Sequence, residues 1–312
     1  MGKVKVLTVG SAYMELCMNT YKVPAPGEVV TDDGGVAYVP GGSGVRCGAA
    51  FTKLGAECRI ASRLGRDLHG QKLYQYFRDL GISTDTVKVD KELPTGLAVV
   101  IKETDEPMRR IIYPGASGAL SCEDISDAVT ADVDAVCLRL DLPEELINAA
   151  IASASVKGIP TFVCQDGFSG GFNLESLPPV DVFVTDVECA ERTVGIRPVG
   201  ADASLRASLA LFKAVSCKYI VIRQGERGAF IYDGKHYFMI PAINAGKPSP
   251  DAAPAEPFFA ALVIRYLLGG GDMKSAVQYA AVVAAIAATH GGGISALPTE
   301  KEVISFLEKY TG

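Results

Sequence analysis

Short apolar runs alternate with helical segments along most of this chain, and this alternation restricts the fold more than any other feature. Residues 4–10 and 134–140 are apolar runs of strand length, while residues 68–80 and 143–156 carry the spacing of amphipathic helices. A strand, a long helix and a second strand form a parallel βαβ unit. The sequence therefore predicts an α/β fold with a doubly wound, Rossmann-like, mostly parallel sheet flanked by helices.

Two segments interrupt the alternation, at about residues 12–40 and 95–115. Both alternate apolar and polar residues with a period of two, and neither contains a helical segment. They predict an antiparallel patch beside the main sheet. Ligands bind beyond the carboxyl ends of the strands in an open α/β sheet, and a small sheet inserted there often acts as a lid. We therefore expect a single domain, residues 1–312, with a β-sheet lid inserted in it.

Charge and hydropathy narrow the choice of partners. The chain is 48% hydrophobic, carries a net charge of −6 and has no Lys/Arg cluster. Nucleic acids and anionic membranes need a positive surface, so neither is an expected partner. Residues 276–289 fit a buried core helix better than a membrane span. The N-terminal residues lead directly into a strand pattern without a signal peptide, which predicts a cytoplasmic protein.

Cysteines and histidines give no metal-binding pattern. The eight cysteines are scattered without a CxxC pair, and the three histidines lie far apart in the sequence. Reduced thiols packed in the core are the expected role of the cysteines. We expect no metal site built from these residues.

Several motifs follow one another in a fixed order. Gly41 and Gly42 precede a helical segment, where bare backbone lets a small ligand approach closely. GxDxxG follows at residues 65–70, PTGLAVVI begins at residue 94, IRQGERGAFIYDG begins at residue 222 and LPTEKEV begins at residue 297. In this order the chain resembles the ribokinase-like (PfkB) carbohydrate kinase family from end to end. The resemblance implies transfer of the γ-phosphate of ATP, with Mg²⁺, to a hydroxyl of a sugar, sugar acid or nucleoside.

The resemblance also implies a substrate pocket. It places Glu15 where the family has an aspartate, together with Gly41 and Gly42, and it places Arg46 where the family has an asparagine. A guanidinium suits an anionic ligand better than a neutral sugar. The expected partner is therefore a small sugar or sugar acid.

The phosphate loop of the family, GAGD, is replaced in this chain. Residues 251–259 read DAAPAEPFF, which puts Pro257 at the position of the catalytic base and Pro254 at the first glycine. Proline offers neither a proton acceptor nor a backbone N–H. Asp251 and Glu256 are the remaining candidate bases. Loss of one oxyanion donor costs a rate factor of roughly 10² to 10³, so we expect kinase activity that is weak or lost.

The nucleotide side of the cleft departs from the family as well. The resemblance places ATP against Asp186, Arg223, Gly225, Gly228 and Ala255. Arg223 stands at the position of a family threonine. The family's NxxE motif falls on Asp186 and Cys189, so a cysteine stands at the position of its glutamate. Glu188 and Glu191 lie nearby and are the alternative candidates for that role.

Structural roles are open for the same residues. Pro257 suits the start of a helix, with Glu256 complementing the helix dipole in the first turn. Arg46 suits an ion pair with a nearby acid, and Asp67 suits the capping position of the following helix.

Three functional hypotheses follow. The first is a kinase with weak or rerouted activity. The second is a pseudokinase that binds a small metabolite without phosphorylating it, and the third is a structural or assembly protein without a ligand. In each case we expect a homodimer through the lid sheet, because the exposed edges of an appended sheet need cover.

Overall fold

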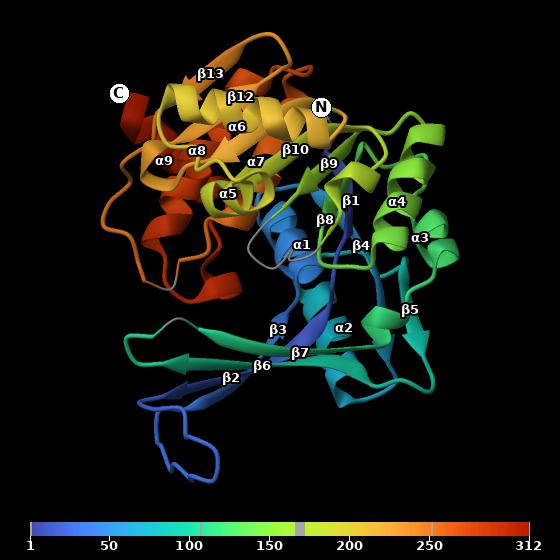
Figure 1. The fold of residues 1–312 in the computed structure, drawn as a ribbon. Coiled ribbons are helices and arrows are strands. Elements are labelled where there is room, and N and C mark those ends of the chain that lie inside the picture. Colours follow the sequence, from blue (N-terminus) through green and yellow to red (C-terminus); the bar gives the residue numbers. More distant parts are fainter. Residues whose placement is uncertain (1, 107, 166–171, 251, 312) are drawn as a thin grey trace.

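The computed structural model describes residues 2–106, 108–165, 172–250 and 252–311 of the chain. Across these residues a nine-stranded main sheet forms the body of the molecule (Figure 1). Its strands, in spatial order, are β13 (Tyr237–Ile240), β12 (Ala229–Tyr232), β11 (Cys217–Arg223), β10 (Val180–Asp186), β9 (Thr161–Cys164), β8 (Ala135–Arg139), β1 (Lys5–Val9), β4 (Glu57–Gly65) and β5 (Val87–Asp90).

The strands from β5 to β11 run parallel, and only β12 and β13 are antiparallel. The predicted doubly wound, mostly parallel sheet is thus confirmed. The chain passes from β1 to β4 and β5 on one side, then returns to β8 on the other side of β1. In open α/β sheets, ligands bind beyond the carboxyl ends of the strands at such a reversal of strand order, which here lies at β1 and β8.

Helices cover both faces of the main sheet. The helices are α1 (Ser43–Lys53), α2 (Leu68–Leu80), α3 (Cys122–Ala128), α4 (Glu144–Val156), α5 (Val187–Val194), α6 (Ala201–Ala214), α7 (Ala255–Leu268), α8 (Met273–Thr289) and α9 (Glu300–Thr311), with short 3-10 turns at Ala116–Ala119, Leu174–Ser176, Gly225–Arg227 and Gly293–Ala296. The core on one face is built with α1, α7 and α8, and the core on the other with α3, α4 and α6. Each face buries the alternate residues of the parallel strands, which explains why those strands are apolar throughout.

A separate four-stranded sheet, the small sheet, lies beside the body (Figure 1). Its order is β3 (Val36–Gly41), β2 (Tyr13–Thr20), β6 (Thr95–Glu103) and β7 (Arg109–Gly115). The outer pairs are antiparallel as predicted, but the central pair, β2 and β6, is parallel. The antiparallel prediction was therefore wrong at the centre. Both central strands leave the body in the same direction, β2 after β1 and β6 after β5, so they meet side by side.

The helix predicted at residues 68–80 forms between clear capping signals. The Asp67 carboxylate accepts a hydrogen bond from the Gly70 amide at 2.7 Å, and Gly81 ends the helix with a φ of 74°. Both are common end signals, a side-chain oxygen at the start and a left-handed glycine at the end. None of the helices in the described part of the chain combines the length and apolarity that a bilayer crossing needs.

Candidate functional site

Two polar residues meet where the strand order reverses. Ser11 follows β1 and Asp141 follows β8, and the Ser11 hydroxyl donates to Asp141 Oδ2 at 2.5 Å. The Ser43 amide, at the start of α1, donates to Ser11 Oγ at 3.1 Å. The carboxyl ends of the two strands are thereby tied to the helix that opens the glycine motif. Sequence reasoning missed this pair, although each residue directly follows a predicted strand.

Glu15, Gly41 and Arg46, which the sequence analysis assigned to a substrate pocket, lie close together, and the side chains of Glu15 and Arg46 contact each other. Glu15, from β2, is only 6% exposed, and Arg46, from α1, donates a hydrogen bond to its Oε1. A Cβ atom on Gly41 would stand 2.5 Å from Glu15 Cδ and 2.6 Å from Oε1. The space left by the bare glycine is therefore filled by the Glu15 carboxyl group.

A second arginine, which sequence reasoning also missed, reaches the same carboxylate. Arg110, from β7, places its Nη2 3.5 Å from Glu15 Oε1. Its side chain is 8% exposed. No short motif surrounds it, and only the pairing of β6 with β7 brings it to the inner face of the small sheet.

Gly42 serves the packing of α1. It has a φ of 98°, and a Cβ atom there would collide with the Ser11 carbonyl group. That carbonyl accepts a hydrogen bond from the Gly44 amide at 3.0 Å. Glycine at this position lets the first turn of α1 lie directly on the end of β1.

The segment that the sequence analysis aligned with the family's phosphate loop forms the beginning of a helix. Helix α7 starts at Ala255 after Pro254, so Glu256 and Pro257 lie in its first turn. Pro257 is buried, and Glu256 is only 7% exposed. The first amides of a helix lack intrahelical acceptors, so a proline here forfeits no hydrogen bond. Asp251 lies outside the described residues.

Glu256 faces a buried arginine that the sequence analysis did not single out. Arg139, at the end of β8, is 1% exposed, and its Nη2 lies 4.0 Å from Glu256 Oε1. A carboxylate at this depth is costly unless a cation compensates it. The Glu256 side chain is thus held against the end of the main sheet.

Both acids of the site, Glu15 and Glu256, raise the pKa of Arg46. Burial lowers the pKa of Arg46, but the carboxylates of Glu15 and Glu256 outweigh burial and raise it. Burial raises the pKa of the neighbouring Tyr13 hydroxyl. The site is therefore a buried set of alternating charges that extends from the small sheet to α7. We call the set the charge row; its members are Arg110, Glu15, Arg46, Glu256 and Arg139.

Two of the residues predicted for the nucleotide, Asp186 and Arg223, pair with each other. Asp186 caps α5 by accepting from the Cys189 amide at 2.8 Å, and Arg223 donates to its Oδ2 at 3.3 Å. Gly225 and Gly228 form the turn between β11 and β12 with φ values of 58° and 91°. A Cβ on Gly228 would collide with a neighbouring backbone carbonyl, so its glycine is required by the turn itself.

The start of α7 does not fit the transferring phosphate of ATP. Of the four backbone nitrogens from residue 254 to residue 257, the two proline nitrogens carry no hydrogen, and the N–H groups of Ala255 and Glu256 remain. Within the described part of the chain, no three His, Cys, Asp or Glu side chains gather in a way that would hold a metal ion. All eight cysteines are free thiols, and only Cys122 is exposed.

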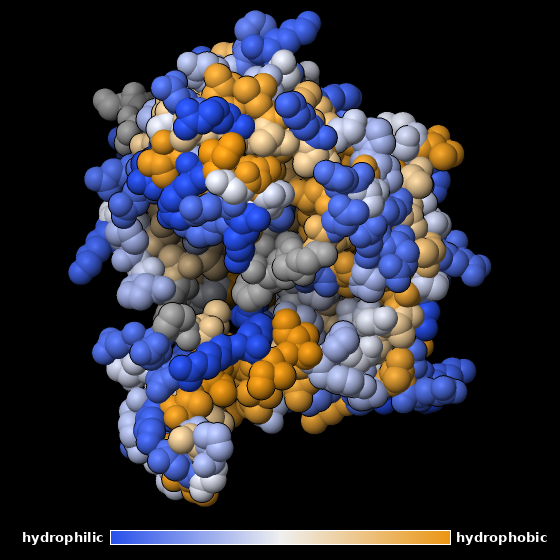
Figure 2. All heavy atoms as spheres, viewed as in Figure 1, coloured by the Kyte–Doolittle hydropathy of each residue, from blue (hydrophilic) through white to orange (hydrophobic). Residues whose placement is uncertain are grey.

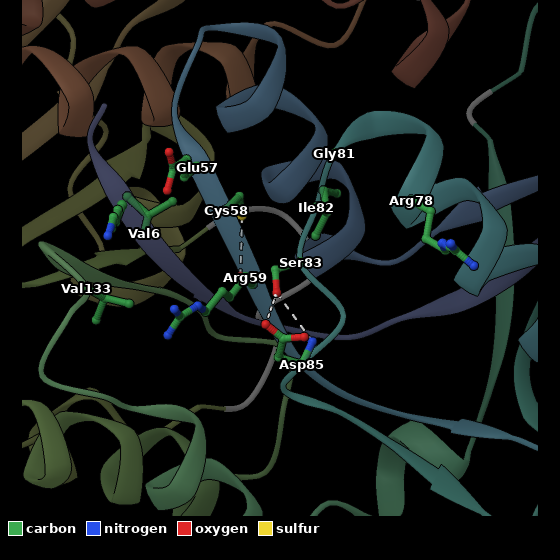
Figure 3. Close-up of a pocket in the computed structure, with 11 residues that line it drawn as sticks. Val6, Glu57, Cys58, Arg59, Arg78, Gly81, Ile82, Ser83, Asp85 and Val133 are labelled. Carbon is green, nitrogen blue, oxygen red and sulfur yellow. Dashed lines mark hydrogen bonds between the residues drawn. The ribbon is translucent and has the colours of Figure 1, made fainter. Parts of the chain in front are cut away.

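A separate cavity of about 460 Å³ lies at the other end of the parallel strands, beside the amino ends of β1 and β4. It is lined by the first residues of β1 and β4 and by the end of α2 (Figure 3). Its Arg59 is already paired with Asp132 at 2.6 Å, and Ser83 donates to Asp85 at 2.9 Å. The cavity shares no residue with the charge row.

Comparisons with known proteins agree on the family-level resemblance. A family model described as pfkB family carbohydrate kinase matches residues 3–300. A ribokinase of Arabidopsis thaliana is 24% identical over 310 residues, which cover 97% of this chain and 81% of that protein. A 2-dehydro-3-deoxygluconokinase of Thermoproteus tenax is 26% identical over 294 residues, with 87% and 86% covered.

Solved structures match over the whole chain. A ribokinase of Giardia lamblia superposes with a TM-score of 0.87 at 19% identity, covering 99% of this chain and 100% of that one. The Arabidopsis thaliana ribokinase complexed with ribose and ATP superposes with a TM-score of 0.85 at 21% identity, covering 98% and 99%. These likenesses establish a ribokinase-like fold.

Proposed function

Since this chain belongs to the pfkB family of carbohydrate kinases, we propose that it binds a small sugar or sugar acid and that its phosphoryl transfer is weak or lost. The observation that carries the proposal is the start of α7. Two prolines and a buried, ion-paired glutamate occupy the segment that would have to receive the phosphate and deprotonate the acceptor hydroxyl.

The chemistry of these three residues supports a large loss of rate. A positioned general base contributes roughly 10² to 10⁴-fold, and Pro257 cannot act as one. Pro254 removes one backbone donor, which is worth a further factor of roughly 10² to 10³. Glu256 would have to leave Arg139 before it could accept a proton from a substrate, which would leave a buried guanidinium without this acid.

The rest of the cleft favours retention of a ligand. The reversal of strand order and the polar residues that follow β1 and β8 are typical of a ligand-binding α/β sheet. The small sheet would act as the lid of a single domain. The surface is hollowed between the body and the small sheet on the face seen in Figure 2. A net charge of −6 favours a small molecule over a nucleic acid, and cytoplasmic localisation stays a prediction.

A coupled ADP-release assay with sugars, sugar acids and nucleosides tests the proposal. We expect turnover at least about 10³-fold below that of an ordinary sugar kinase, since a base and a donor are both replaced. Thermal shift with one of the same acceptors, and none with ATP–Mg²⁺, would identify the binding-only form. The structural hypothesis predicts no shift with any of them.

Two variants identify the base if turnover is found. Loss of activity in Glu256→Gln but not in Asp251→Asn would assign the base to Glu256. Turnover at the rate of ordinary sugar kinases would overturn the proposal of weak or lost transfer.

We further propose that two copies associate through the outer face of the small sheet. The strand register puts Tyr38, Leu16, Val99 and Ile111 in one row across that face. Tyr38 is 51% exposed and Ile111 is 71% exposed. Hydrophobic side chains gather over this part of the molecule in Figure 2. A face of this composition is covered by the same face of a second copy in a two-fold dimer.

A further inference from the structure

The cavity beside the amino ends of β1 and β4 is lined by charged side chains of both signs. Lys5 and Arg78 bring positive charges, and Glu57 and Asp85 bring negative charges. The volume of about 460 Å³ lies in the range of sites that hold small molecules. The cavity lies at the opposite end of β1 from Ser11, so an occupant would not compete with a ligand in the cleft.

The side chains of Lys5 and Glu57 stay apart although the sheet places the two residues side by side. The register pairs Lys5 with Glu57 on neighbouring parallel strands, so both side chains leave the same face of the sheet. Neighbouring strands are only about 4.8 Å apart, and two long side chains can easily meet across that distance. Within the described part of the chain, however, neither side chain has an ion-pair partner. Their two charges therefore border the cavity without neutralising each other.

The other charges of the cavity divide into held and unpaired groups. Arg59 donates to both oxygens of Asp132, at 2.9 and 2.6 Å, and this pairing lowers the pKa of Asp132 to about 2. Such a two-point contact is strong, so Arg59 forms a wall of the cavity and is not available to a ligand. Asp85 accepts a hydrogen bond from the Ser83 hydroxyl at 2.9 Å. The lining charges that have no partner among the described residues are Lys5, Glu57 and Arg78.

These three charges restrict the chemistry of a ligand. An anion would be attracted by Lys5 and Arg78 but repelled by Glu57, and a cation would meet the opposite arrangement. A free amino acid carries a carboxylate and an ammonium group on one carbon atom. It can therefore pair with charges of both signs, in charge-assisted hydrogen bonds.

Apolar residues complete the lining of the cavity. Val6, Ile82 and Val133 line it and are buried. In Figure 3, Val6 and Val133 lie on one side of Arg59, and Ile82 lies on the other. The ligand's own side chain would lie against these residues, and an aliphatic one loses contact with water at no cost in hydrogen bonds.

We propose that this cavity binds a free aliphatic amino acid. Its carboxylate pairs with Lys5 and Arg78, and its ammonium group pairs with Glu57. The proposal does not depend on the proposed function, because the cavity shares no residue with the cleft.

Three small molecules of matched shape test the proposal. Isothermal titration calorimetry with the full chain compares L-valine with isobutylamine, which lacks the carboxylate, and with isovalerate, which lacks the ammonium group. We expect L-valine to bind at one site per chain, and each analogue to bind at least about 10-fold more weakly, because each leaves charges of one sign without a partner. Equal affinity of the three compounds, or no binding of L-valine, L-leucine and L-isoleucine at millimolar concentration, would overturn the proposal.

Variants of the lining charges locate the bound amino acid. Lys5→Met and Glu57→Gln should each lower the affinity for L-valine by at least about 10-fold. Glu57→Gln should also abolish the preference for L-valine over isovalerate, while the preference over isobutylamine remains. A purely structural role of Glu57 would not produce this selective change.

Lys3→Met is the matched control, because Lys3 is an exposed lysine near the start of the same strand and does not line the cavity. It should leave the affinity for L-valine unchanged. Circular dichroism and the melting temperature verify that each variant is folded. Unchanged affinity in folded Lys5→Met and Glu57→Gln would place the amino acid elsewhere and refute the assignment, with no consequence for the function proposed for the cleft.

Discussion

The side chain of Asp67 connects the first turn of α2 to the start of β6. Its Oδ1 accepts from the Gly70 amide at 2.7 Å and from the Thr95 hydroxyl at 2.8 Å, and its Oδ2 accepts from the Thr95 amide at 2.7 Å. One carboxylate thus caps α2 and holds the first residue of β6. Burial raises the pKa of Asp67, but these hydrogen bonds outweigh burial and lower it.

Asp67→Asn should destabilise the protein by about 1–3 kcal/mol at pH 7, because one acceptor is replaced by a donor that faces the Thr95 amide. The wild-type pKa lies below the unfolded value of 3.8. The advantage of Asp67 is therefore complete above that value and is lost as the pH falls through the lower, folded pKa. Urea unfolding of both proteins between pH 7 and pH 3 measures this difference.

The control for Asp67 lies on the same helix. Asp79 is exposed and accepts only a local hydrogen bond from Gln75 at 2.7 Å. Asp79→Asn should change the free energy of unfolding by less than about 0.5 kcal/mol. If both variants lose equal stability, the link through Thr95 is not what Asp67 contributes.

The roles of single residues were predictable where the residue type and its immediate neighbours suggest a role. The capping role of Asp67 is confirmed, and so is the alternative in which Arg46 pairs with an acid. Pro257 lies in the first turn of α7, but as its third residue rather than its first. The contact of Ser11 with Asp141 spans 130 residues, so no local pattern contains it. Arg110 and Arg139 were missed for the same reason, because only the assembled sheets place them in the cleft.

Helix α7 begins inside the segment that the sequence analysis aligned with the family's phosphate loop. Pro257 was considered as the start of this helix, and the helix starts two residues earlier, at Ala255. Pro254 has helical backbone angles, with φ −80° and ψ −9°, and leads the chain into the first turn. In contrast, α2 begins and ends at the predicted residues, because Asp67 and Gly81 are ordinary capping groups.

Pro257→Ala should change the free energy of unfolding by less than about 1 kcal/mol, because the first-turn amide it restores has no intrahelical acceptor. Ala261→Pro, one turn further along the same buried helix, should cost about 3 kcal/mol or more, because it removes an internal hydrogen bond. Denaturant unfolding compares the two. A loss of more than about 2 kcal/mol in Pro257→Ala would contradict the placement of Pro257 in the first turn.

The fold of the whole molecule follows from the alternation of strands and helices, with one exception. The alternation does not predict the parallel pairing of β2 with β6. The parallel sheet and its flanking helices were predictable, because each βαβ unit restricts the next. The parallel pairing of β2 with β6 was not predictable, because paired residues such as Thr20 and Glu103 lie 83 positions apart in the sequence, and neither segment carries a sign of their relative direction.

The proposed dimer belongs to this scale. Ile111→Lys on the outer face of the small sheet should convert a dimer into a monomer in analytical ultracentrifugation, because it buries a charge at the centre of the contact. Val156→Lys, at a residue of α4 that is 88% exposed, should leave the dimer intact. A monomeric wild-type protein at micromolar concentration would contradict the proposed association.

The three hydrogen bonds at Asp67 have a mechanical consequence. They fasten the first turn of α2 to the first residue of β6, and the interior of α2 is anchored in turn by the buried side chains of Leu73 and Phe77. A pivot of the small sheet about its base would therefore transmit torque to α2. Opening and closing of the cleft would be accompanied by a tilt of that helix, and its exposed C-terminal end would be the place to attach a probe of the motion.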